Sequence, residues 1–224
     1  MFSISTSQAS FVSGGKDIRL DCFLPENNGR RFPAILALYG FGGGHATMSE
    51  PARQLAAQGF AVYVLHYFDR TGLVEPEKAA LVRYFPVWMK TLWDAVSFVE
   101  RQPQVDATRV GLIGFSLGGY LAVCNAVIDP RIQAVVEFFG GMPKEMKLFM
   151  RRLCPMLILH GEADPIIPVA EAYHLKEVLE RKGIPCEMQI YPGAGHGFDG
   201  EEWSDAKLRS LAFMRRYLGE ERLG

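Results

Sequence analysis

The chain has 224 residues, of which 49% are hydrophobic and 22% charged, and its 24 Lys and Arg nearly balance its 25 Asp and Glu. Basic residues are clustered no further than in pairs, which argues against nucleic acid or an anionic membrane surface as a partner. No apolar run reaches the roughly 18 residues that a membrane span needs, so we expect no membrane insertion.

The N-terminal residues, MFSISTSQASF, have neither a basic start nor an apolar core, so we expect no signal peptide. The four cysteines are spread singly, without a C-x-x-C pair, which favours reduced buried thiols over a disulfide framework or a zinc site. These features predict a cytoplasmic protein, monomer or homodimer, in which residues 1–224 form one domain.

Two β-like runs open the chain, at residues 8–12 and 18–23, and the Gly-Gly between them predicts an antiparallel hairpin. A loop is expected at residues 25–29. Strands and helices then alternate, in this order: strand 34–38, helix 51–58, strand 61–65, helix 85–101, strand 110–113, helix 120–127, strand 134–139, strand 156–160, helix 169–181, strand 187–191 and helix 203–218.

The central strands, AILAL, AVYVL, VGLI and MLIL, are apolar on both faces. Strands of this kind are buried by a parallel sheet with helices on both sides. The predicted fold class is therefore α/β, with a mostly parallel sheet. In such a sheet, ligands bind beyond the carboxyl ends of the strands.

The segment Gly114-Phe-Ser-Leu-Gly118 lies between a predicted strand and a predicted helix and matches G-x-S-x-G, the pattern of a nucleophile elbow. Glycines before and after the apex relieve the crowding of a sharp turn, which would expose the Ser116 hydroxyl. The simpler alternative is a Gly-rich turn in which Ser116 only caps the helix.

Two later strands are followed by Asp164 and His196, so the chain presents Ser, Asp and His in this order, each just past a strand. A serine hydroxyl needs a base such as imidazole, and a carboxylate behind the imidazole fixes its tautomer. The alternatives are a turn residue for Asp164 and a surface loop for His196. Glu137 and Glu162 are rival acids, and we favour Asp164 over both.

An acyl-transfer site also needs donors for the oxyanion. We expect these from the N–H of Leu117, at a helix N-terminus, and from the N–H of Phe41 in the run Tyr39-Gly-Phe-Gly-Gly-Gly44, with Gly40 or Gly42 as neighbouring choices. The alternative, a phosphate-binding loop, is disfavoured because the run lacks G-K-[ST] and the spacing of G-x-G-x-x-G.

Apolar side chains flank these loops and are candidates for an acyl pocket or for the core. The predicted substrate-binding residues are Phe68, Phe115, Met142, Ile166 and Phe198. The residues between the strands at 134–139 and 156–160 are too few for a lid, which favours small or flexible substrates.

Other polar residues have weaker assignments. His160 is expected to brace a loop, while His45 and His66 each could contact substrate. Asp69 and Arg70 are expected to pair with each other. The histidines are scattered and form no H-x-x-x-H pattern, so no metal site is predicted.

The chain resembles the α/β-hydrolase superfamily and, within it, the dienelactone hydrolase family. The resemblance rests on the segments 40–42, 68–72, 114–119, 160–165 and 195–198. It implies a capless hydrolase of esters or lactones that needs no cofactor.

The chain departs from the namesake enzymes, which carry cysteine at the elbow, a glutamate in the oxyanion loop and arginines that bind the substrate carboxylate. Here Ser116 stands at the elbow, Tyr39-Gly40 replaces the glutamate, and no arginine is near His196. The expected function is therefore a serine esterase acting on small carboxylic esters or lactones. The alternatives are a dienelactone hydrolase proper, a small acyl-peptide hydrolase and, least favoured, a non-catalytic binding protein.

Overall fold

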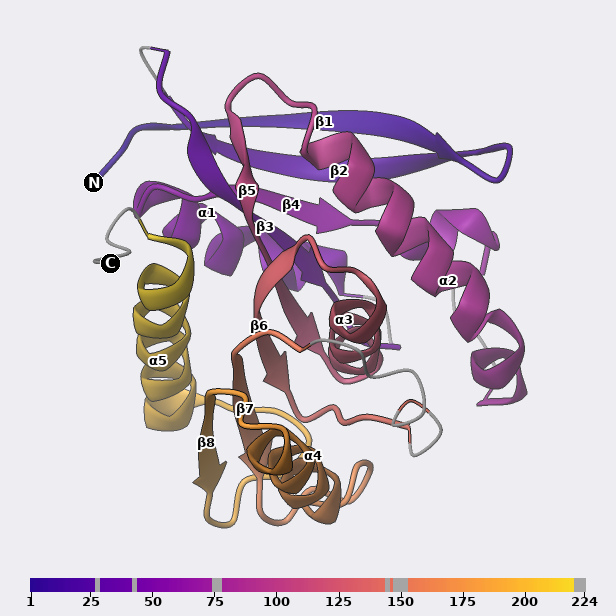
Figure 1. Ribbon diagram of the computed structural model, residues 1–224, viewed down its shortest axis with the longest axis vertical. Coiled ribbons are helices and arrows are strands. Elements are labelled where there is room, and N and C mark those ends of the chain that lie inside the picture. Colours follow the sequence, from indigo (N-terminus) through magenta and orange to yellow (C-terminus); the bar gives the residue numbers. More distant parts are fainter. Residues whose placement is uncertain (27–28, 42–43, 74–77, 144–145, 147–152, 220–224) are drawn as a thin grey trace.

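The structure, a computed structural model, describes residues 1–26, 29–41, 44–73, 78–143, 146 and 153–219 (Figure 1). Within these ranges its elements, in chain order, are β1 (Ile4–Ser13), β2 (Lys16–Pro25), β3 (Phe32–Leu38), the 3-10 helix η1 (His45–Met48), α1 (Ser49–Ala57), β4 (Ala61–Leu65), the 3-10 helix η2 (Tyr67–Arg70), α2 (Lys78–Val99), β5 (Val105–Phe115), α3 (Leu117–Ile128), β6 (Ile132–Phe138), β7 (Met156–Gly161), α4 (Ala170–Arg181), β8 (Cys186–Tyr191) and α5 (Gly200–Leu218).

The described strands form one sheet in the order β1-β2-β4-β3-β5-β6-β7-β8. Strands β4, β3, β5, β6, β7 and β8 run parallel to one another. Strands β1 and β2 form an antiparallel hairpin, and β2 pairs with β4 in antiparallel orientation. The predicted α/β class and the predicted N-terminal hairpin are both confirmed.

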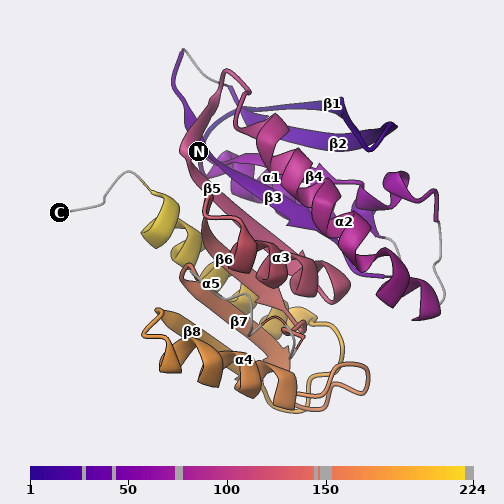
Figure 2. The same ribbon diagram turned by 45° about the vertical axis from the view of Figure 1, so that its right-hand side comes forward.

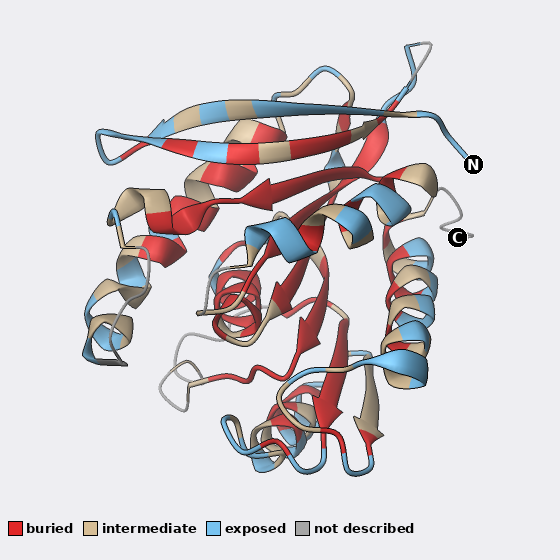
Figure 3. Cartoon of the chain, turned by 180° about the vertical axis from the view of Figure 1, so that it is seen from behind, coloured by how far each residue is buried: buried red, intermediate tan, exposed pale blue. Residues whose placement is uncertain are grey.

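Helices cover both faces of the sheet. Figures 1 and 2 show α2, α3 and α4 on one face and α1 and α5 on the other. Strands β3, β4 and β7 are buried along their whole length (Figure 3). This burial explains why their sequences are apolar without alternation.

Several elements are longer than predicted, and α2 and β5 begin the furthest ahead of their predicted starts. Helix α2 begins at Lys78 instead of residue 85 and contains Pro86 in its interior. Proline removes the hydrogen bond to the carbonyl of Val82, and Val82 is 84% exposed, so water can satisfy that carbonyl. Strand β5 begins at Val105 instead of residue 110 because Val105 pairs with Phe32 of β3.

The parallel strands direct their carboxyl ends to one edge of the sheet. The segments after β3, β5, β7 and β8 therefore lie near one another, and these segments contain Gly40, Ser116, Asp164 and His196. The segment expected to be too short for a lid lies largely outside the described residues. In the described part of the chain, no helix has the length and apolar character of a membrane span.

Candidate active site

Ser116 lies at a sharp turn between β5 and α3. Its φ is 54° and its ψ is −117°, a backbone conformation that is costly for a residue with a side chain. A hydrogen bond from the Ser116 N–H to the Phe138 carbonyl oxygen (2.9 Å) ties the turn to β6. The predicted strand–turn–helix geometry is therefore present.

The side chains of Ser116, His196 and Asp164 form a continuous hydrogen-bonded chain. His196 Nε2 lies 2.9 Å from Ser116 Oγ, and His196 Nδ1 lies 2.6 Å from Asp164 Oδ2. These pairs are 80 and 32 residues apart in sequence. Among the described residues, the Ser116 hydroxyl makes no helix-capping hydrogen bond, so its contact with the imidazole favours a nucleophile over a helix cap.

Both carboxylate oxygens of Asp164 form hydrogen bonds. Oδ1 accepts hydrogen bonds from the N–H groups of Ile166 (2.8 Å) and Ile167 (2.9 Å), which leaves Oδ2 for the imidazole. The residue is 8% exposed. These hydrogen bonds fix the carboxylate in the orientation in which Oδ2 faces the imidazole of His196.

His160 contacts the loop that carries Asp164. Its Nε2 lies 2.9 Å from the Ile167 carbonyl oxygen, and burial lowers the pKa of this imidazole. His160 thus braces the loop that carries Asp164, in agreement with the prediction.

The rival acids lie elsewhere. Glu162 is exposed. Glu137, on β6, is fully buried; its Oε2 accepts a hydrogen bond from the Gly140 N–H (2.7 Å), and its Oε1 has no partner among the described residues. Burial raises the pKa of Glu137 to about 8, which the hydrogen bond from Gly140 only partly offsets.

The predicted oxyanion donors flank Ser116. Leu117 is the first residue of α3, so its N–H lies at the positive end of that helix. On the other side, the Gly40 backbone approaches so closely that a Cβ at position 40 would lie 3.2 Å from the Ser116 Cβ. Phe41 follows Gly40 directly, whereas Gly42 lies outside the described residues. The roles of Phe41 and Leu117 stay predictions.

A cavity of about 450 Å³ opens beside the Ser–His–Asp chain. Its walls include Gly40 and also Phe139, whose ring centroid lies 4.8 Å from that of His196. Its complete lining is Tyr39, Gly40, Thr47, Met48, Glu50, Pro51, Gln54, Phe115, Phe139, Gly197, Phe198, Trp203 and Lys207.

Of the predicted substrate-binding residues, Phe115 and Phe198 line this cavity. Phe68 packs in the core against the ring of Trp88, with centroids 5.0 Å apart, and Met142 is buried. The Ile166 side chain is 63% exposed, and its backbone N–H is the group that serves the site.

Several wall residues were not predicted from the sequence. Met48, Trp203 and Lys207 come from helical segments, where a side chain that faces a cavity cannot be distinguished in sequence from one that faces the core. Phe139 could have been suspected from the sequence, because it lies at the end of an apolar strand. In the structure its φ is positive, 40°.

The remaining polar candidates stabilise the neighbouring loops. His66 Nε2 lies 2.8 Å from Asp21 Oδ2, and the ring of His45 lies 4.5 Å from that of His66. The predicted pairing of Asp69 with Arg70 is wrong. Asp69 binds Arg19 of β2 through Oδ1 (2.8 Å) and Oδ2 (2.9 Å). Arg70 Nη1 donates instead to the Gly14 carbonyl oxygen (2.7 Å) in the β1–β2 turn.

Metal-binding side chains do not gather in the part of the chain that the structure describes: no three His, Cys, Asp or Glu residues there form a cluster that could hold an ion. The hydrogen bonds that join Ser116, His196 and Asp164 give an arrangement that can perform nucleophilic attack by Ser116 Oγ with proton transfer to His196.

Comparisons with known proteins agree with this geometry. The family model described as "Dienelactone hydrolase family" matches residues 20–215. A relative from Methylorubrum extorquens, which bears the provisional name carboxymethylenebutenolidase, is 29% identical over 191 residues, or 77% of this chain and 65% of the relative. Acyl-coenzyme A thioesterase 1 of Rattus norvegicus is 33% identical over 177 residues, or 76% of this chain and 40% of the relative.

The chain thus spans less than two thirds of the length of these two relatives. Among solved structures, a dienelactone hydrolase-like promiscuous phosphotriesterase from metagenomic libraries is similar, with a TM-score of 0.83 and 19% identity. This match covers 96% of this chain and 99% of the other. Because the family model matches most of the chain, the protein belongs to the dienelactone hydrolase family, a family of carboxylic ester hydrolases with the α/β-hydrolase fold.

Proposed function

We propose that this chain hydrolyses carboxylic esters or lactones through an acyl-enzyme formed on Ser116. The observation that carries the proposal is the hydrogen-bonded chain from Ser116 Oγ through His196 to Asp164, with heavy-atom distances of 2.9 and 2.6 Å. Distances of this length allow direct proton transfer between the hydroxyl and the imidazole.

In the first half-reaction, Ser116 Oγ attacks the carbonyl carbon and passes its proton to His196 Nε2. The negative charge that develops on the carbonyl oxygen is stabilised by the N–H groups of Leu117 and Phe41. When the tetrahedral intermediate collapses, the bond to the leaving oxygen breaks, and His196 Nε2 gives its proton to the departing alcohol. Asp164 keeps the Nδ1 proton in place throughout.

In the second half-reaction, a water molecule gives a proton to His196 Nε2 and attacks the acyl carbon. The bond to Ser116 Oγ then breaks, the serine recovers its proton, and the carboxylic acid leaves. Every step uses protein groups and water.

Hydrolysis of p-nitrophenyl acetate tests the proposal. We expect wild type to release p-nitrophenol in a burst and Ser116→Ala to lose roughly 10⁴- to 10⁶-fold in kcat. Mass spectrometry of the quenched wild type should find one acetyl group on the peptide that contains Ser116. Activity that survives in the alanine variant would overturn the assignment of the nucleophile.

A thioester is the second candidate substrate class, because a relative 33% identical over 177 residues is named an acyl-coenzyme A thioesterase. The same acyl-enzyme forms from either class, so the comparison of an acetyl thioester with p-nitrophenyl acetate distinguishes them. Dienelactone and an acyl-peptide anilide complete the panel of alternatives.

The domain organisation, the cellular location and the oligomeric state expected from the sequence are also proposals. The side chains of Ser116, Asp164 and His196 follow strands of one sheet, which supports one catalytic domain over residues 1–224. Cys22, Cys124 and Cys186 are not joined by a disulfide, which supports a cytoplasmic enzyme. The oligomeric state, monomer or homodimer, is still a prediction.

A further inference from the structure

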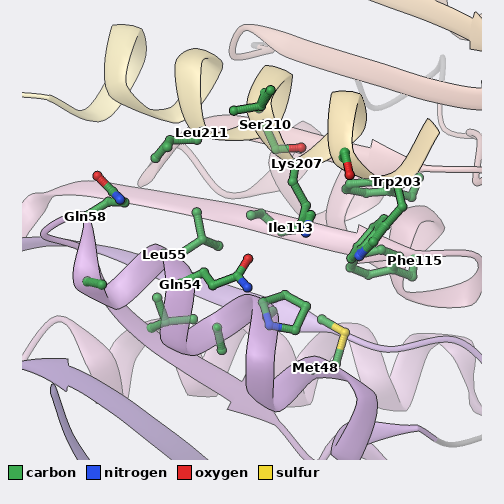
Figure 4. A pocket seen from close by; sticks show the side chains of 18 of the residues that line it. Met48, Gln54, Leu55, Gln58, Ile113, Phe115, Trp203, Lys207, Ser210 and Leu211 are labelled. Atoms are coloured by element: carbon green, nitrogen blue, oxygen red, sulfur yellow. The ribbon is translucent and has the colours of Figure 1, made fainter. Parts of the chain in front are cut away.

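A second cavity lies between α1 and α5, on the face of the sheet opposite to α2, α3 and α4. Its volume is about 470 Å³. Figure 4 shows side chains of α1, such as Leu55, and of α5, such as Leu211, pointing toward one another above Ile113 of β5. The cavity is thus built from elements that are far apart in the sequence.

This inner cavity adjoins the cavity beside Ser116, and the two share part of their walls. The residues that line both are Met48, Pro51, Gln54, Phe115, Trp203 and Lys207. Phe115 directly precedes Ser116, and its ring lies 6.2 Å from that of Trp203, measured between centroids. The wall that the two cavities share therefore includes the residue next to the proposed nucleophile.

Most residues that line the inner cavity are apolar, and its few polar side chains form hydrogen bonds with other protein groups. Gln54 Nε2 donates to Glu50 Oε1 (2.9 Å), and Gln58 Oε1 accepts from Arg215 Nη2 (2.5 Å). Ser204 and Ser210 donate to carbonyl oxygens of their own helix, at 3.0 and 2.7 Å.

These pairs take up Gln54 Nε2, Gln58 Oε1 and both serine hydroxyl hydrogens, so few side-chain groups remain for a polar ligand. Lys207, the one cation among the lining residues, belongs to the shared wall and lies over the ring of Trp203, with Nζ 5.8 Å from the centroid. Apolar sites of this size bind apolar ligands.

We propose that the inner cavity binds the acyl chain of the substrate, an unbranched hydrocarbon chain of medium length. This inference rests on the proposed function and specifies its substrate class. A methylene group needs about as much space as a water molecule, roughly 30 Å³, so a chain of roughly ten carbons takes up about 300 Å³ and fits within the cavity's volume of about 470 Å³. Met48 and Gln58 mark its two ends in Figure 4.

The acyl chain fits this position better than the alcohol does. The acyl group stays bound to Ser116 through both half-reactions, whereas the alcohol has to leave before water attacks. An inner cavity that begins beside Ser116 suits the group that remains. The inference specifies the expectation of small or flexible substrates, because it assigns a place to a flexible acyl chain.

The test compares p-nitrophenyl acetate, butyrate, octanoate and decanoate. In wild type, kcat/KM should rise with acyl length by up to about fourfold for each methylene group that becomes buried. Leu55→Trp and Leu211→Trp fill the inner cavity from its two helices. Both should lose at least about tenfold on decanoate and stay within about twofold of wild type on acetate, because neither residue lines the cavity beside Ser116.

Val82→Trp is the matched control. Val82 is exposed on α2, on the opposite face, and this variant should keep the full chain-length profile. Thermal unfolding identifies a variant that fails to fold, and Leu211→Phe then replaces it as a milder filling. A flat chain-length profile in wild type, or an equal loss on acetate and decanoate in the filled variants, overturns the inference. So does a chain-length preference that follows the alcohol in a series of alkyl acetates.

Calorimetric binding of decanoate keeps the inference testable without catalysis. Wild type and Ser116→Ala should both bind decanoate, and Leu211→Trp should bind it at least about tenfold more weakly. If no ester is hydrolysed but decanoate binds in this way, the proposed function fails and the cavity assignment stands. If acetate is hydrolysed through Ser116 but decanoate does not bind, the cavity assignment fails alone.

Discussion

Gly118 packs against the backbone of Leu38 so closely that a Cβ at position 118 would lie 2.3 Å from the Leu38 carbonyl oxygen. Gly114 is equally constrained, because a Cβ there would lie 2.2 Å from the Gly118 carbonyl oxygen. The start of α3 is thus pressed onto the end of β3, the strand that leads to Gly40. The two glycines of the G-x-S-x-G pattern bring the Ser116 turn and the predicted oxyanion loop together.

Gly118→Ala should therefore reduce both stability and activity. The added methyl group meets backbone atoms that cannot move separately, so we expect a loss of about 3 kcal/mol in the free energy of unfolding and a large fall in kcat. Thermal and urea unfolding measure the first effect and ester hydrolysis the second. Gly195→Ala is the stability control, because no heavy atom outside its chain neighbours lies within 4 Å of a Cβ at that position. Equal stability of the two variants would contradict the packing argument.

Asp164→Asn should leave the fold intact and remove most of the activity. The amide oxygen can still accept from the N–H groups of Ile166 and Ile167. The amide nitrogen would then face His196 Nδ1 and donate to it, which places the ring proton on Nε2, where it blocks acceptance of the serine proton.

We expect a fall in kcat of roughly 10⁴-fold with little change in the unfolding temperature. Asp205→Asn on α5 also removes one carboxylate, which is paired with Arg209, and should keep its activity. Near-normal kcat in Asp164→Asn would show that another carboxylate orients the imidazole.

Asp69→Ala should weaken the attachment of η2 to β2 without affecting catalysis. Burial alone would raise the pKa of Asp69, but the hydrogen bonds from the Arg19 side chain and N–H lower it overall. The carboxylate therefore stabilises the fold at neutral pH, and this contribution is lost as the pH falls below 3.8, the ordinary pKa of an aspartate side chain. Since Arg19 is largely exposed, we expect a loss of only about 1 kcal/mol, which salt reduces. Urea unfolding at two salt concentrations measures it; a fall in kcat would contradict a purely structural role.

The sequence predicts the parallel sheet and the positions of Ser116, Asp164 and His196 because each depends on local information: an apolar strand followed by a turn. The carboxyl ends of parallel strands share one edge, so residues 80 positions apart could be expected to meet there.

Interactions that depend on the packing of separate elements could not be predicted. Asp69 pairs with Arg19, 50 residues away on another strand, whereas its sequence neighbour Arg70 suggested a local pair. The inner cavity depends on how far α1 and α5 stand apart, which is set by the summed volumes of side chains such as Leu55 and Trp203. A local sequence pattern does not predict the distance between these two helices.

Glu137 should make the protein less stable as the pH rises. Its carboxyl group has a pKa of about 8 in the folded chain because it is fully buried, whereas the ordinary pKa of a glutamate side chain is 4.5. Between these two values the unfolded chain has lost the proton that the folded chain still holds, so the free energy of unfolding decreases as the pH increases. The stabilisation is complete below about pH 4.5 and is lost as the pH rises through about 8.

Glu137→Gln removes this titration and keeps an oxygen that can accept from the Gly140 N–H. We therefore expect the variant to match wild type near pH 5 and to be more stable than wild type near pH 9, by urea unfolding at both values. Glu162→Gln is the control, because Glu162 is exposed, and its pH dependence should follow that of wild type. A Glu137→Gln variant with the wild-type pH slope would show that Glu137 is already ionised in the folded protein at neutral pH. The Gly140 turn beside Phe139 and His196 would then carry a buried negative charge.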